Sequence, residues 1–107
     1  NFFEFQIPTT KLLGFEIPFS GGGYLRLIPW FFFKRIFKSE ISKKKEYQVF
    51  LHPFELYSGE FNLPIKVNLL SKLRFNINRR RNIYKVERLI KIAKDKGYTF
   101  KTMKEAL

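Results

Sequence analysis

The feature that most constrains the fold of this chain is a run of strand-forming residues, Tyr47 to Leu51, that ends abruptly in His52 and Pro53. Successive Val, Phe and Leu side chains are typical of a strand covered on both faces, as in a parallel sheet flanked by helices. Proline has no N–H and cannot continue a ladder, so the strand is expected to stop there. The only histidine of the chain is therefore predicted at the carboxyl end of a buried strand, where α/β folds place their chemistry. This makes His52 the candidate catalytic residue.

Composition narrows the classes of protein that fit. With 107 residues, the chain forms one domain or a piece of one, and 45% apolar residues with fourteen Phe suffice for a core. A formal net charge of +12 attracts anionic partners such as nucleic acid, lipid headgroups or acidic glycans, although a general abundance of lysine explains the same charge. The absence of cysteine excludes disulfides and thiolate metal sites. No apolar stretch has the length of a membrane span.

Before the central strand, prolines and glycines mark the predicted ends of strands and a predicted turn. Alternating apolar and polar residues predict short strands over residues 2–7 and 15–17, each followed by a proline. Residues 20–24 contain three consecutive glycines and predict a turn. Either a need for positive φ or bare backbone lying against a ligand explains these glycines.

A helix is expected from Leu25 to Lys38, interrupted or restarted at Pro29, which suits a first helical turn. Its aromatic residues allow two interpretations. Phe33 and Phe37, like Phe32 and Ile36, are four residues apart and form a face that can pack on a core. The alternative is that Trp30, with the neighbouring Phe and basic residues, dips into a membrane interface. The core is the commoner use of such a face and is the interpretation favoured here. Residues 39–45 are expected to form a solvated basic linker.

The second half of the chain predicts fewer regular elements. Residues 53–71 lack a clean period and predict a long loop, while Arg79–Arg81 is either a solvated face or a phosphate-contact patch. Asn82 is predicted to cap a helix that runs through Lys96, with Gly97 at its end. A short strand over residues 98–100 and a last helical turn follow, the turn begun by a capping box of Thr102 and Glu105.

The predicted order of strand, helix, strand, long loop, helix and strand indicates an α/β fold with a parallel sheet. The strands are too few to close a barrel or to have both faces of a sheet covered. Since the chain also begins at Asn1 without Met or a signal-peptide pattern, we expect a fragment of a larger domain.

Three segments, taken with their spacing, resemble a known family. They are Ile17-Pro-Phe-Ser-Gly-Gly-Gly-Tyr-Leu-Arg-Leu-Ile-Pro29, then Tyr47-Gln-Val-Phe-Leu-His-Pro-Phe-Glu-Leu56, then a helix followed by Tyr98-Thr-Phe-Lys-Thr-Met-Lys-Glu105. Together they resemble the C-terminal part of NodB-like polysaccharide deacetylases, the fourth carbohydrate-esterase family, in the type linked to exopolysaccharide loci. The resemblance covers nearly all of the chain, and the first two segments carry most of its specificity.

The resemblance implies the C-terminal portion of a distorted (β/α) barrel that removes N-acetyl groups from N-acetylhexosamine-containing polysaccharide. In that family a divalent metal, usually zinc, is held by an Asp and two His in the N-terminal half, which also supplies the Asp general base. This chain has no Thr-Phe-Asp-Asp run, and its only aspartate is Asp95. Residues 1–107 are therefore expected to be the C-terminal part of a single deacetylase domain, with the metal-binding half absent. The metal ligands would lie outside this chain, and the fragment alone should bind no zinc and be inactive.

The resemblance also assigns roles. His52 matches the general acid that protonates the leaving amine. Phe50 and Leu51 match apolar residues that wall the acetyl-methyl pocket. The other residues expected to bind substrate are Gly22, Gly23, Tyr24 and Arg26, with Tyr24 and Arg26 lining the cleft beside the glycine loop. Pro53 and Glu55 are expected to support the site. The expected partners are the glycan substrate and the missing N-terminal half; specific nucleic acid is not expected, and membrane contact is the less favoured alternative.

Glu55 has two possible roles in this scheme. It would support the site by anchoring the loop or by favouring the imidazolium form of His52; otherwise it is a solvent-facing loop acid. The chain departs from the family at Phe54, where Trp is usual. It departs again after Glu55, where Tyr57–Pro64 replaces Asp-Pro and Gln-Pro-Arg, and at Leu73–Asn78. These departures affect the expected substrate-side loop more than the assignment of His52 as the general acid.

A second hypothesis comes from a different class of protein. The charge of +12, the segment Trp30–Arg35 and the run Arg79–Arg81 fit a non-catalytic cationic module that binds an anionic membrane surface or nucleic acid. Such binding would fall steeply with salt, whereas a deacetylase would release acetate.

Overall fold

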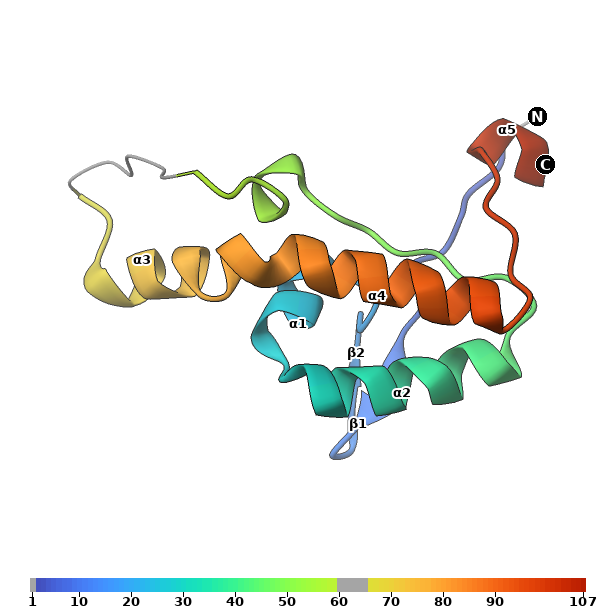
Figure 1. The fold of residues 1–107 in the computed structure, drawn as a ribbon, viewed down its shortest axis with the longest axis horizontal. Coiled ribbons are helices and arrows are strands. Elements are labelled where there is room, and N and C mark those ends of the chain that lie inside the picture. The colour runs from blue at the N-terminus through green and yellow to red at the C-terminus, as the bar shows by residue number, and fades with distance from the viewer. Residues whose placement is uncertain (1, 60–65) are drawn as a thin grey trace.

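The computed structural model describes residues 2–59 and 66–107 as a mixed α/β arrangement made mostly of helices (Figure 1). In chain order its elements are β1 (Thr10–Leu12), β2 (Phe15–Ile17), α1 (Gly22–Leu27), α2 (Trp30–Lys43), the 3-10 turn η1 (Pro53–Glu55), α3 (Leu69–Asn76), the 3-10 turn η2 (Arg79–Arg81), α4 (Asn82–Asp95) and α5 (Met103–Ala106). The predicted long loop over residues 53–71 is thus shortened by η1 and α3, and its part at 60–65 lies outside the described residues.

The sheet of the described chain is an antiparallel hairpin of β1 and β2, with Thr10 opposite Ile17 and Leu12 opposite Phe15. Its two-residue turn, Leu13 and Gly14, has positive φ at both positions (52° and 83°), as a tight hairpin of this kind requires. The predicted strand at 15–17 is confirmed. The mixed α/β class is confirmed, but the sheet among the described residues is this antiparallel hairpin and not the predicted parallel sheet.

The strands predicted over residues 2–7 and 98–100 do not form. Their alternating or β-branched side chains favour an extended backbone, but a strand also needs a neighbour that accepts and donates ladder hydrogen bonds. The central segment, predicted as a buried strand from Tyr47 to Leu51, makes a single parallel bridge between Phe50 and Gly21. It is not covered on both faces, because the Phe50 side chain is 44% exposed.

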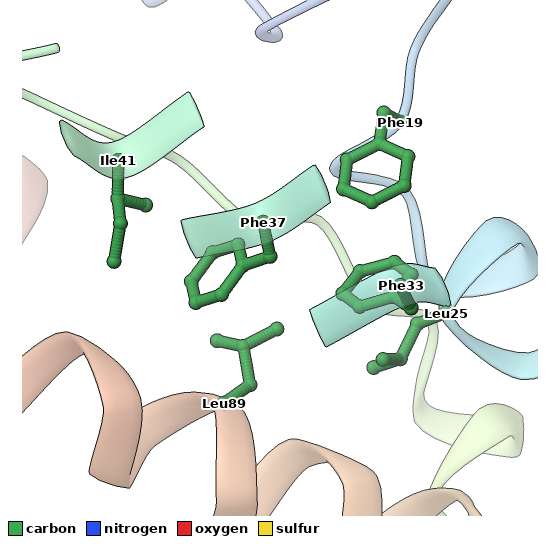
Figure 2. Packing of buried hydrophobic residues seen from close by; sticks show 6 residues of the cluster. All are labelled: Phe19, Leu25, Phe33, Phe37, Ile41 and Leu89. Atoms are coloured by element: carbon green, nitrogen blue, oxygen red, sulfur yellow. The ribbon is translucent and has the colours of Figure 1, made fainter. Parts of the chain in front are cut away.

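The core lies between α2, α4 and the chain entering α1 (Figures 1 and 2). Phe33 and Phe37 project from successive turns of α2, and the Phe33 ring stacks on Phe19 with ring centres 4.4 Å apart. The buried apolar side chains of this cluster are Phe19, Leu25, Phe33, Phe37, Ile41 and Leu89. The predicted core face of α2 is thus confirmed at Phe33 and Phe37. It is wrong at Phe32, which is exposed.

The helix boundaries follow local signals closely. Pro29 separates α1 from α2, as predicted. The helix α2 continues to Lys43, so most of the predicted linker at 39–45 is helical. At the end of α4, Gly97 has a φ of 88°, which confirms its predicted role, and the Thr102 capping box that begins α5 is also formed. In the part of the chain that the structure describes, no helix is both long and apolar enough to cross a membrane.

Candidate functional site

The segment from His52 to Glu55 forms a closed turn. Pro53 begins the 3-10 turn η1, and the Glu55 N–H donates to the His52 carbonyl oxygen at 3.0 Å. In return, the His52 N–H donates to Glu55 Oε2 at 2.8 Å. The Glu55 side chain is only 2% exposed, so it is not a solvent-facing loop acid. Its carboxylate contacts the backbone of His52, which is the geometry of a loop anchor.

Gly22 lies directly against this turn. Its N–H donates to the Phe50 carbonyl oxygen at 2.7 Å, and the Phe50 N–H donates to the Ser20 carbonyl oxygen at 3.1 Å. A Cβ atom on Gly22 would overlap Glu55 Oε2 and lie 2.8 Å from a methyl carbon of Leu51. The glycine is therefore explained by close approach. Neither Gly22 nor Gly23 has positive φ, and a Cβ on Gly23 would meet open space.

The His52 imidazole is exposed and lies between two aromatic rings. The Phe50 ring meets it edge-on at 4.8 Å between centres, and the Phe54 ring stacks with it at 5.7 Å. Phe54 stacks in turn on Phe75 of α3, with centres 4.7 Å apart and planes 9° apart. The stacked rings of Phe75, Phe54 and His52 thus form one column, which ends at the exposed histidine.

Arg26 is buried beneath this column. Its guanidinium lies 5.7 Å from the centre of the Phe54 ring and donates to the carbonyl oxygen of Phe75. Burial lowers the pKa of Arg26, while the nearby Glu55 charge opposes that shift and the Arg79 charge adds to it. The side chain therefore ties α1 to α3 from within, whereas the expectation placed Arg26 on the lining of a cleft. Tyr24, on the same helix, is half-buried.

Lys85 stabilises the C-terminal end of α1. Its Nζ donates to the carbonyl oxygens of Leu25, Arg26 and Ile28 at 2.9, 3.3 and 3.1 Å. These carbonyls lie at the last turn of α1 and just beyond it, where a cation is favoured. Burial lowers the pKa of Lys85. This side chain joins α4 to the helix that contains Gly22 and Arg26.

Two buried polar residues of the site were not predicted. Asn82 is fully buried as the first residue of α4, where it was expected as a cap, and its Nδ2 donates to the Glu55 carbonyl oxygen at 3.0 Å. Arg79 is 3% exposed and donates to the carbonyl oxygens of Tyr57 and Gly59. It therefore belongs to neither a solvated face nor a phosphate-contact patch. Nothing in a run of three arginines distinguishes the one that turns inward.

The comparisons with known proteins give one match. The model of a family described as "Domain of unknown function (DUF3473)" matches residues 1–107. This chain belongs to the DUF3473 family. No curated protein and no solved structure matches it.

Within this DUF3473 chain, the described residues do not fit a metal centre. They contain no group of three His, Cys, Asp or Glu side chains close enough to hold an ion, and the rings that contact His52 are those of Phe50 and Phe54. No chemical step is therefore assigned to a metal on these residues.

The DUF3473 chain also has a cavity of about 900 Å³ away from the histidine. It lies between residues 3–6, residues 44–48 and the segment from Lys96 to Leu107. None of the predicted site residues lines it. Among the described residues, the candidate site is therefore an exposed turn that lies outside this cavity.

Proposed function

We propose that this DUF3473 chain is the C-terminal part of a NodB-like polysaccharide deacetylase domain, and that His52 is its general acid. The observation that carries the proposal is the direct contact between the two most specific motif segments. The glycine segment pairs with Phe50 and receives the Glu55 carboxylate at Gly22, although some thirty residues separate the two segments. In the proposed enzyme, both segments would contribute to one site.

The chemistry needs an acid at such a position. When water adds to the acetyl carbonyl of an N-acetylhexosamine, the tetrahedral intermediate collapses to acetate only if its C–N bond breaks and the amine departs. An amine leaves poorly as an anion, so a proton from the imidazolium of His52 would pass to the departing nitrogen. The exposure of the ring leaves it open to a sugar, and its contacts with Phe50 and Phe54 restrict its orientation.

The other predicted residues fit supporting roles in this proposal. Phe50 is partly exposed beside the imidazole and, with Leu51, is proposed to wall the acetyl-methyl group. Glu55 and Pro53 would hold the turn, and Gly22 leaves room for that carboxylate. Tyr24 would lie on the glycan side. Arg26 is proposed to hold α1 and α3 together beneath the acid, without contacting substrate.

The proposed enzyme is a larger barrel. The parallel bridge at Phe50 is what adjacent strands of a (β/α) barrel would make, and it supports the finer fold assignment. The missing half would supply the remaining strands, the divalent metal with its Asp and His ligands, and the general base. When bound there, the metal would polarise the acetyl carbonyl.

The proposal is tested on the complete gene product by measuring acetate release from N-acetylglucosamine oligomers. The wild-type protein is expected to be active. His52→Ala is expected to lose about 10²–10⁴-fold in turnover, as for a lost general acid. A matched variant, Tyr84→Ala, removes an exposed ring of α4 and should keep wild-type turnover. Near-full turnover of His52→Ala would refute the role of His52, and an inactive wild-type protein would refute the deacetylase proposal itself.

A further inference from the structure

Helix α2 exposes an aromatic pair that the core does not use. Phe31 is 70% exposed and Phe32 is 57% exposed, and their rings meet edge-on at 5.5 Å between centres. Their neighbour Phe33 is buried. Figure 1 shows α4 along one side of α2. The pair therefore faces outward in the described structure, and no described contact with the core explains it.

The same face of α2 is cationic. Lys34, Arg35 and Lys38 are exposed and follow Phe31 by three, four and seven residues, so they surround its ring on the helix surface. The single acidic residue of α2, Glu40, is half-buried and pairs with Lys44 Nζ at 2.9 Å. The exposed face therefore has no acid of its own. Lys34 and Lys38 are also one turn apart, where like charges repel and weaken a helix.

We propose that this face of α2, defined as Phe31, Phe32, Lys34, Arg35 and Lys38, docks on an anionic lipid bilayer. The two rings enter the interfacial region, where aromatic side chains are favoured, and the three cations lie over lipid phosphates. Charge complementarity selects an anionic surface. Duplex nucleic acid would satisfy the cations but leave both rings in water, so the pairing of rings with cations favours the membrane. This attachment is separate from the proposed deacetylation and would hold the protein at a membrane surface.

Vesicle co-sedimentation of the complete gene product tests this attachment. The vesicles are phosphatidylcholine alone or phosphatidylcholine mixed with phosphatidylglycerol. Binding is expected only with the anionic lipid and should weaken as salt rises. The triple variant Lys34→Gln/Arg35→Gln/Lys38→Gln should bind roughly 100-fold more weakly, at about fivefold per cation. The pair Phe31→Ser/Phe32→Ser should bind about tenfold more weakly or worse and keep the wild-type melting temperature, because both rings are exposed.

A matched control removes the same charge elsewhere. Lys91→Gln/Lys94→Gln/Lys96→Gln also removes three charges, from exposed positions at the end of α4, and should cost less than about tenfold. An equal loss in both triple variants would contradict the proposal, since binding would then follow total charge. It would also be overturned by equal binding to neutral vesicles, by binding to a DNA duplex without binding to vesicles, or by a lower melting temperature in the Phe31/Phe32 variant. A lower melting temperature would mean that another part of the protein covers this face.

Discussion

At the residue scale, Gly22 matters because of what a side chain would meet there. The Glu55 carboxylate and Leu51 fill the space that a Cβ would need. The residue therefore sets how closely α1 can approach the turn that holds His52.

Gly22→Ala is expected to destabilise the protein by about 1–3 kcal/mol, because the new methyl group must displace a buried carboxylate or the backbone. Urea unfolding measures this free energy. Gly23→Ala is the matched control, since a Cβ there meets open space within α1, and it should stabilise by up to about 1 kcal/mol. Equal effects of the two substitutions would mean that the close approach at Gly22 is not real.

Tyr47 is a second residue whose environment should be measurable, through the pH dependence of stability. Its ring packs edge-on against Phe37 with centres 5.4 Å apart, and its hydroxyl is buried with no hydrogen-bond partner in the described structure. Burial, followed by the charge of Glu40 and the neighbouring Tyr98, raises the pKa of Tyr47 well above the ordinary value of 10.0. The folded state thus holds this proton more tightly than the unfolded state.

The sign of the pH effect follows from that difference. The stabilisation is complete below about pH 10, the unfolded pKa, and is lost as the pH rises through the higher folded pKa. Tyr47→Phe should therefore flatten the alkaline fall in stability. At neutral pH it should be neutral or stabilising by about 1 kcal/mol, since it removes an unpaired hydroxyl. Unfolding free energies measured across the alkaline range test this. The exposed Tyr84→Phe is the control and should leave the curve unchanged; identical curves for wild type and Tyr47→Phe would contradict the assignment.

The sequence located some residues of the candidate site and missed others for a physical reason. A proline after a hydrophobic run ends an extended segment wherever it occurs, so the turn at His52 was predictable. The inward direction of Arg79 depends on the carbonyls of Tyr57 and Gly59, and the burial of Asn82 depends on the Glu55 carbonyl. Such partners are fixed only by the tertiary fold.

At the scale of elements, α2 is secured from outside its own sequence. The Tyr98 hydroxyl lies within hydrogen-bonding range of the Ile41 carbonyl oxygen at 2.6 Å and of the Lys44 carbonyl oxygen. These groups are at the carboxyl end of α2, where the last carbonyls have no partner within the helix. The segment after α4 thus closes the end of α2.

Tyr98→Phe is expected to cost about 1 kcal/mol of unfolding free energy, the typical net value of one such hydrogen bond. The last turn of α2 should also fray, because its carbonyls lose their donor. Hydrogen exchange of the amides of residues 41–44 should accelerate, while the first turns of α4 remain protected. Unchanged exchange at those amides would show that the tyrosine does not secure the helix.

Helices were predicted better than strands for a simple reason. Helix ends are set by residues that act on their sequence neighbours, so they can be predicted from the sequence. Examples are Pro29, Gly97 and the Thr102 capping box. A strand depends on a partner, and residues 2–7 and 98–100 have none in the described structure. Along α2, the four-residue spacing found both Phe33 and Phe32. Which of them is covered depends on the tertiary contacts of α2, such as the stacking of Phe19 on Phe33.

At the scale of the whole molecule, the chain is expanded for its length. Its radius of gyration is 15.5 Å, whereas a compact domain of about 100 residues has about 13 Å. Several large apolar side chains are also exposed, including Leu13, Phe15, Leu69 and Leu70. Both observations fit the proposal that further strands and helices pack on this chain in a larger domain.

The most direct measurement of the central claim compares two leaving groups in the complete gene product. A general acid matters when an amine departs and matters little when an aryl oxide departs, because the aryl oxide is stable without a proton. His52→Ala should therefore lose about 10²–10⁴-fold in turnover on N-acetylglucosamine oligomers but less than about tenfold on a nitrophenyl acetate. A melting temperature equal to that of wild type ensures that both values come from folded protein. Equal losses on the two substrates, or no loss on the oligomers, would contradict the assignment of His52 as the general acid.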